Sequence, residues 1–107
     1  MEKWIKTIRK NLIPKRSGGN ILLDDQQVAL FHYNEDHWFA TQNQCPHCEQ
    51  MVISRGIVGD FKEEPKVVCP LRKEAFSLKT GKEFEKNGFS LKVYPVMIKD
   101  DFVFIKA

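Results

Sequence analysis

The sequence predicts an all-β fold, a small antiparallel β-sandwich or barrel with an aromatic core. Short runs of aliphatic, β-branched and aromatic residues recur between polar turns, and no segment keeps a helical period. Eight Phe, two Trp and two Tyr supply the bulk of such a core. A chain of 107 residues suits one modest core, so residues 1–107 are predicted to form a single domain.

The N-terminal segment shows little strand pattern. One helical turn is expected near residues 8–12, because Pro14 would end a helix there. The Ser17-Gly18-Gly19 stretch is predicted to be a loop, since small flexible residues are typical of connections.

Two hairpins are predicted next. The apolar runs 21–23 and 28–33 flank the polar residues 24–26, and a third run at 37–41 follows the polar trio 34–36. Polar turns of this length between strand-like runs are typical of antiparallel neighbours.

The second half continues the pattern. The run 66–68 leads directly into Cys69, and two further runs at 75–78 and 83–84 bracket Thr80-Gly81. The glycine there suits a turn with positive φ. Each cysteine segment is therefore expected to lie at the end of a strand.

The last two runs span residues 91–98 and 102–105, across a turn at Asp100-Asp101. Pro95 lies inside the first of them. Proline cannot donate a hydrogen bond to a neighbouring strand, so an edge strand or a bulge is predicted at this position.

Composition narrows the function classes. Hydrophobic residues make up 42% and charged residues 29%, and the net charge of +3 is too weak to indicate nucleic-acid binding. No apolar run reaches the roughly 20 residues that span a bilayer, and the N-terminus lacks a signal-peptide pattern. A cytoplasmic location is therefore expected, in which three cysteines would not form a disulfide framework.

Two short segments carry the chemistry: Cys45-Pro46-His47-Cys48 and Cys69-Pro70-Leu71-Arg72. A C-x-H segment followed by C-x-x-H holds a Rieske [2Fe–2S] cluster, with two thiolates on one iron and two imidazoles on the other. Cys45, His47 and Cys69 match three of these ligands, whereas the fourth position is Arg72.

The whole chain resembles a Rieske-type domain. The resemblance rests on the cysteine segments, on the stretch 51–60 with Ser54-Arg55-Gly56, and on residues 76–81. Within this superfamily, the Ser-Arg-Gly stretch and the opening and ending of the chain are similar to the small subunit of assimilatory NAD(P)H-dependent nitrite reductase.

This resemblance implies a fold and a partner. The fold would be a Rieske-like antiparallel sandwich with a small two-loop subdomain at about residues 43–78. The partner would be the large subunit, which carries FAD, a [4Fe–4S] cluster and sirohaem and reduces nitrite to ammonium. This chain would then be an accessory subunit without a catalytic residue of its own.

Arg72 decides what the loops are expected to hold. A guanidinium stays protonated and has no lone pair for a metal, so Cys45, His47 and Cys69 form an incomplete Rieske set. The chain is therefore expected to carry no cofactor, with a [2Fe–2S] electron-transfer protein as the alternative.

Zinc is the remaining alternative. The Cys45-x-x-Cys48 spacing is that of a zinc knuckle, Cys69 would be a third ligand, and His47 or His37 a fourth. His47 and Cys48 are adjacent, however, and neighbouring residues of an extended segment point to opposite sides. His47 and Cys48 are therefore not expected to bind the same metal ion unless the loop coils tightly.

Overall fold

The computed structural model describes residues 3–35, 37–84 and 88–107, and these contain ten strands and two short 3-10 helices. The elements are β1 (Trp4–Arg9), η1 (Lys10–Leu12), β2 (Ser17–Leu23), β3 (Gln26–Asn34), β4 (His37–Gln42), η2 (Ile53–Arg55), β5 (Ile57–Phe61), β6 (Glu64–Val68), β7 (Ala75–Ser77), β8 (Val93–Tyr94), β9 (Val96–Lys99) and β10 (Phe102–Lys106).

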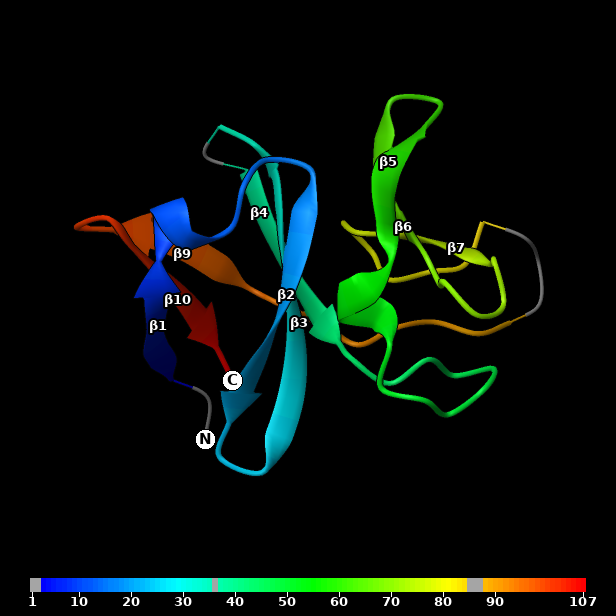
Figure 1. The fold of residues 1–107 in the computed structure, drawn as a ribbon, viewed down its shortest axis with the longest axis horizontal. Helices are drawn as coiled ribbons and strands as arrows, with labels where there is room; N and C mark the ends of the chain where they lie inside the picture. Colours follow the sequence, from blue (N-terminus) through cyan, green and yellow to red (C-terminus); the bar gives the residue numbers. More distant parts are fainter. Residues whose placement is uncertain (1–2, 36, 85–87) are drawn as a thin grey trace.

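The strands form three antiparallel sheets (Figure 1). The strand orders are β1-β10-β9, β2-β3-β4-β8 and β5-β6-β7. In Figure 1 the first sheet lies at one end of the long axis and the third at the other, with the second between them. The predicted all-β antiparallel architecture is confirmed.

Strand β3 joins two cores. Val28 and Leu30 belong to a core shared with β4, β8 and β10, whereas Ala29 and Phe31 belong to a second core that includes Cys45. Successive strand residues point to opposite faces, so an uninterrupted apolar run is what burial on both faces requires. The second core supports the cysteine loops.

The predicted loop at 17–19 is wrong, because these residues begin β2 and pair with β3. Gly18 lies opposite Phe31, and a Cβ on it would come within 2.7 Å of the Phe31 ring. The glycine is therefore explained by close packing of an aromatic ring against the strand and not by a turn.

Strand β1 was not predicted. It pairs with β10 in the register Ile5↔Ile105, and only residues 10–12 of the expected helical turn are helical. The partner strand comes from the opposite end of the sequence, so no local hairpin signal marks it. The first and last strands consequently lie side by side (Figure 1).

Both predicted hairpins are confirmed, although Gln26 and Asn34, which were expected in the turns, lie in β3. Leu23 pairs with Gln26 across Asp24-Asp25, and Asn34 pairs with His37. Residue 36 of the second predicted turn lies outside the described residues.

Pro95 marks a change of sheet. Val93–Tyr94 pairs with β4 and Val96–Lys99 pairs with β10, and both strands are edges of their sheets. The predicted edge position of the proline is confirmed.

The third sheet contains a hairpin that the sequence revealed only in part. Strand β5 was not predicted, and β6 begins before the expected run 66–68. Lys62 and Glu63 form the connecting turn with φ of 49° and 69°. Positive φ at both positions is typical of a type I′ turn, which usually signals itself by Asn-Gly.

Gly81 closes the segment that follows β7. Its φ is +81°, as the sequence predicts, and a Cβ would lie 2.0 Å from the carbonyl oxygen of Leu91. Phe76 in β7 pairs with Glu83 just beyond this turn. The turn thus brings Glu83 back towards the second core.

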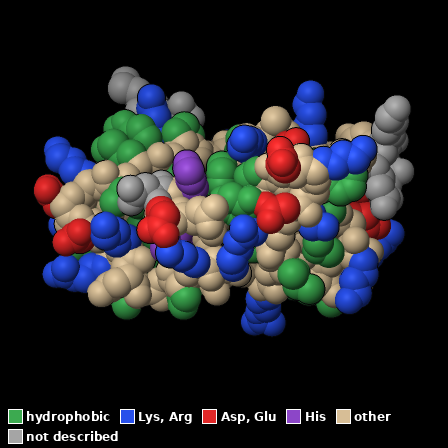
Figure 2. Space-filling model, turned by 90° about the horizontal axis from the view of Figure 1, so that it is seen from above, with side chains coloured by type: hydrophobic (Ala, Val, Ile, Leu, Met, Phe, Trp, Pro, Cys, Tyr) green, Lys and Arg blue, Asp and Glu red, His purple; other side chains and the backbone are tan. Residues whose placement is uncertain are grey.

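The surface carries mixed charge. In Figure 2, basic side chains are scattered over the visible face with acidic ones among them and do not form one continuous patch. Among the described residues, no helix has the length and apolarity that crossing a membrane would need.

Candidate functional site

Two loops in the half of the molecule that contains the third sheet have the same backbone conformation. Loop 1 (residues 45–50) follows β4, and loop 2 (residues 69–74) links β6 to β7. In loop 1 the N–H of Glu49 donates to the carbonyl of Cys45 at 2.8 Å, and the N–H of Cys45 donates to the carbonyl of Gln50 at 2.9 Å.

Loop 2 repeats this pattern. The N–H of Lys73 donates to the carbonyl of Cys69 at 2.8 Å, and the N–H of Cys69 donates to the carbonyl of Glu74 at 2.9 Å. The fifth residue has positive φ in both loops, 60° at Glu49 and 68° at Lys73. The loops therefore correspond residue by residue, with Cys45 matching Cys69 and Cys48 matching Arg72.

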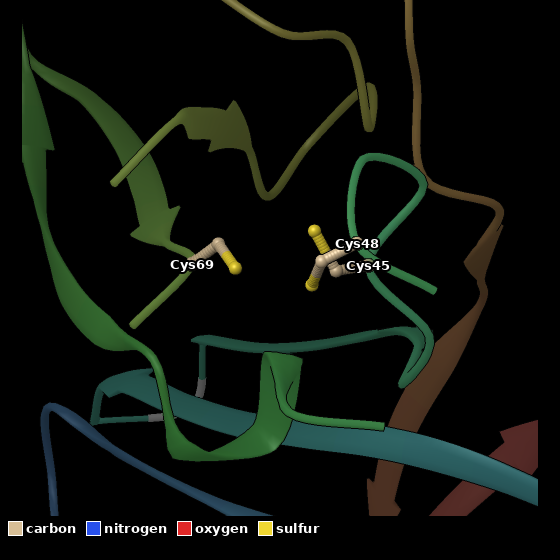
Figure 3. Close-up of side chains that lie close together, drawn as sticks. All are labelled: Cys45, Cys48 and Cys69. Atoms are coloured by element: carbon tan, nitrogen blue, oxygen red, sulfur yellow. The ribbon is translucent and has the colours of Figure 1, made fainter. Parts of the chain in front are cut away.

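The loops bring three thiols together, and we call Cys45, Cys48 and Cys69 the thiol cluster (Figure 3). Their Sγ atoms all lie within 4.8 Å of one another, and all three cysteines are free. Cys45 and Cys69 are fully buried and Cys48 is partly exposed. Two thiols come from loop 1 and one from loop 2.

The surroundings of these thiols differ. Burial raises the pKa of the Cys45 thiol to about 11. The pKa of the Cys48 thiol lies below its usual value, chiefly because the backbone N–H of Gln50 points at the sulfur and stabilises a thiolate. Cys48 is thus the more nucleophilic of the two at neutral pH.

His47 faces two carboxylates. Its Nε2 lies 3.1 Å from Glu83 Oε2, and its Nδ1 lies 3.9 Å from Glu74 Oε2 and 3.9 Å from Cys45 Sγ. The His47 and Glu83 side chains are only 6% and 1% exposed. The ring packs on Phe89 with 4.4 Å between centroids. The structure places His47 and Cys48 in separate groups of candidate ligands.

Arg72 lies at the surface. Its side chain is 50% exposed, and Nη2 lies 3.6 Å from Glu74 Oε1. Such an ion pair with a half-exposed guanidinium adds little stability. This guanidinium occupies the fourth position of loop 2 without offering a donor atom for a metal.

The residues present do not fit a complete Rieske cluster. Cys45 and Cys69 lie close enough to share one iron, and His47 is nearby. The second imidazole has no counterpart, because Arg72 cannot coordinate iron and Leu71 is apolar. One iron of such a cluster would keep a single protein ligand.

The sequence identified the two loops but not all their partners. Glu83 was not singled out, since it comes 36 residues after His47 and only the turn at Gly81 returns it to the site. His37, considered as a zinc ligand, is exposed and lines a shallow pocket with Tyr33 and Phe39. It belongs to neither group of candidate ligands among the described residues.

Fold and paired loops together define a Rieske-like domain, and comparison with known sequences agrees. The sequence model of the Rieske-like [2Fe–2S] domain family matches residues 3–106. The chain is 36% identical to the nitrite reductase (NADH) small subunit of Escherichia coli K12, and the alignment covers 100% of both chains.

Two further relatives are informative. The NMR structure of the E. coli protein NirD has a TM-score of 0.89 at 35% identity, covering 100% of this chain and 98% of that chain. A nitrite reductase [NAD(P)H] large subunit of Klebsiella oxytoca is 30% identical over 95% of this chain but only 11% of its own length. The chain therefore belongs to the nitrite reductase small-subunit family, as its sequence predicted.

Proposed function

We propose that this chain is the accessory small subunit of a cytoplasmic NAD(P)H-dependent nitrite reductase and acts by binding the large subunit, without a [2Fe–2S] cluster of its own. The expected absence of a cluster is supported by the incomplete ligand set, in which Arg72 stands where a Rieske site has an imidazole. Reduction of nitrite to ammonium would take place on the large subunit.

Family relationships support a large-subunit partner. The E. coli relative that aligns over its full length is a small subunit, and the K. oxytoca large subunit contains a segment similar to this chain. In that protein, a domain of this kind and the rest of the large subunit are parts of one polypeptide. Association of the separate chain with a large subunit is the corresponding arrangement.

Apolar side chains near the loops would provide the contact. Leu71 on loop 2 is 57% exposed, Met51 just after loop 1 is 47% exposed, and Phe89, whose ring packs on His47, is 43% exposed. Exposed apolar groups of this kind around a polar centre are typical of docking surfaces. The half-exposed Arg72 adds a positive charge that would favour an acidic counterpart.

The experiment is co-purification with the large subunit, with nitrite-dependent NADH oxidation measured with and without this chain. We expect Leu71→Asp to weaken association at least about tenfold, the effect of a residue worth more than ~1.4 kcal/mol at an interface. Leu22→Asp is the matched control, because Leu22 is 68% exposed on β2, away from the loops. Failure to associate would contradict the proposal, as would equal effects of the two variants.

A second function is favoured by one observation. The Cys45 and Cys69 Sγ atoms lie within 4.8 Å of each other, so a small closure would let both bind one iron, which would suit a [2Fe–2S] electron-transfer protein with an unusual fourth ligand. Protein purified and reconstituted without oxygen would then contain iron and acid-labile sulfide in equal amounts. A colourless, iron-free preparation would exclude this alternative.

A further inference from the structure

We propose that the thiol cluster is a binding site for a single thiophilic d10 cation, Zn²⁺ or Cu⁺, held by Cys45, Cys48 and Cys69 and left with one open coordination position. Of the three residues that match Rieske ligand positions, the site uses Cys45 and Cys69, and it uses Cys48 in place of His47. It is independent of the proposed role as an accessory subunit.

The equivalence of the two loops is the first argument. Paired turns that each present the first and fourth residue to a common centre would supply four ligands, and Cys45, Cys48 and Cys69 occupy three of these positions. Arg72 occupies the last, with its side chain turned to the surface. The loops thus form a four-position frame with three thiols and one vacant corner.

Distance is the second argument. Four sulfurs at about 2.3 Å from a tetrahedral Zn²⁺ lie about 3.8 Å from one another. The three Sγ atoms here already lie within 4.8 Å of one another, so closure of at most about 1 Å would suffice. All three cysteines are free, and no rearrangement of a disulfide is needed.

Donor chemistry selects the ion. Three thiolates are soft ligands, which favour Zn²⁺ and Cu⁺ over Mg²⁺, Ca²⁺ or Mn²⁺. The nearest imidazole, His47, lies between Glu83 and Glu74, with Nε2 only 3.1 Å from Glu83 Oε2. The fourth position is therefore assigned to water on Zn²⁺, whereas Cu⁺ would be complete with three thiolates.

Titration of the reduced, metal-free full chain tests the proposal. Zn²⁺ is added in competition with a chromophoric chelator, Cu⁺ in a parallel anaerobic arm, and Co²⁺ replaces Zn²⁺ to give sulfur-to-metal charge-transfer bands. We expect one ion per chain and a four-coordinate Co²⁺ spectrum. The cation that binds the protein with the higher affinity is the preferred one, and absence of binding in both titrations would overturn the proposal.

Cys48→Ser is the decisive variant, because Cys48 is partly exposed and is not a Rieske ligand position. We expect affinity to fall by more than the roughly tenfold to hundredfold that loss of an outer-sphere partner costs. His47→Gln should lose less affinity than Cys48→Ser, because His47 approaches Cys45 Sγ to 3.9 Å without being a ligand of the proposed site. His37→Gln is the matched control and should retain wild-type affinity, because His37 is exposed and belongs to neither group of candidate ligands. Unchanged binding in Cys48→Ser, or an equal loss in His47→Gln, would overturn the three-thiol site.

Arg72→Cys tests the four-position frame of the loops by a gain in metal affinity. A fourth thiol at the position equivalent to Cys48 should tighten Zn²⁺ binding and shift the Co²⁺ spectrum to that of four thiolates. Circular dichroism of each variant verifies the fold. Unchanged affinity and spectrum in folded Arg72→Cys would contradict the equivalence of the loops, and association with the large subunit can be measured separately in the same samples.

Discussion

Loop 1 and loop 2 have the same backbone and different side chains. Each carries the same two hydrogen bonds from and to its first cysteine, and each places its fifth residue at positive φ. At the fourth position, however, loop 1 has a thiol that joins the thiol cluster, and loop 2 has an arginine at the surface.

The comparison shows that the backbone conformation of a loop does not depend on the side chain at its fourth position. Pro46 and Pro70 follow the cysteines and restrict φ in both loops, so the turns form whichever side chain comes fourth. Metal binding, in contrast, depends on the donor atom at each position. The loop geometry that the two segments share is thus compatible with more than one set of donor atoms.

The largest expected effect is a gain of cluster binding in Arg72→His. An imidazole at this position would supply the lone pair that arginine lacks, so we expect iron and sulfide to bind in equal amounts on anaerobic reconstitution, unlike in the wild type. Leu71→His is the control, since it places the imidazole one residue earlier. Failure of Arg72→His would mean that loop 2 differs from a Rieske loop at more than its fourth position.

The next effect concerns the core that both loops share. Phe76 is fully buried in the core that includes Cys45 and Cys69, so Phe76→Ala should reduce the free energy of unfolding by about 3–5 kcal/mol. Phe61→Ala, at a 42% exposed ring, should cost no more than about 1 kcal/mol. Urea denaturation measures both. Alkylation of Cys45 and Cys69 should accelerate together, and acceleration in one loop alone would argue against a common support.

Thiol reactivity should differ within loop 1. Because burial raises the pKa of Cys45 to about 11 while the Gln50 N–H lowers that of Cys48, Cys48 is thiolate at a lower pH. We expect iodoacetamide to modify Cys48 at least about tenfold faster at pH 8. The Cys45 rate should continue to rise above the pH at which the Cys48 rate levels off. Equal rates by mass spectrometry would contradict this order.

The smallest effect tests the equivalence of the loops directly. Glu49→Val and Lys73→Val should each cost about 1–2 kcal/mol, because a β-branched residue disfavours the positive φ at both positions. Glycine at either position should be close to neutral, since relief of strain offsets its greater freedom in the unfolded chain. Thermal unfolding gives the comparison, and a cost in only one loop would break the equivalence.

Local patterns predicted the elements whose partners are close in sequence. The hairpins around residues 24 and 34 form as the apolar runs on either side of each polar turn indicate, and Pro95 lies at a sheet edge. Strand β1 was missed because its partner β10 comes from the other end of the chain, and β5 because the Lys62-Glu63 turn lacks the usual residues.

The candidate site divides in the same way. Cys45, His47 and Cys69 follow from spacing alone, and the effect of Arg72 follows from its chemistry. The Cys45-x-x-Cys48 spacing also indicated Cys48 and Cys69 as candidate ligands of one metal. The approach of Glu83 to His47, in contrast, depends on how loop 1 and the turn at Gly81 pack on one core, and it carries no periodic or motif signal in a single sequence.

The pairing of the first and last strands has a consequence for how this unit combines with others. Trp4 lies opposite Lys106, so the backbone enters and leaves through neighbouring strands, and the β1-β10-β9 sheet lies at the other end of the long axis from the third sheet (Figure 1). Fusion of another protein to either terminus would therefore be made at the end of the molecule opposite the third sheet. The same architecture can therefore serve as a free-standing polypeptide or as a covalently tethered module.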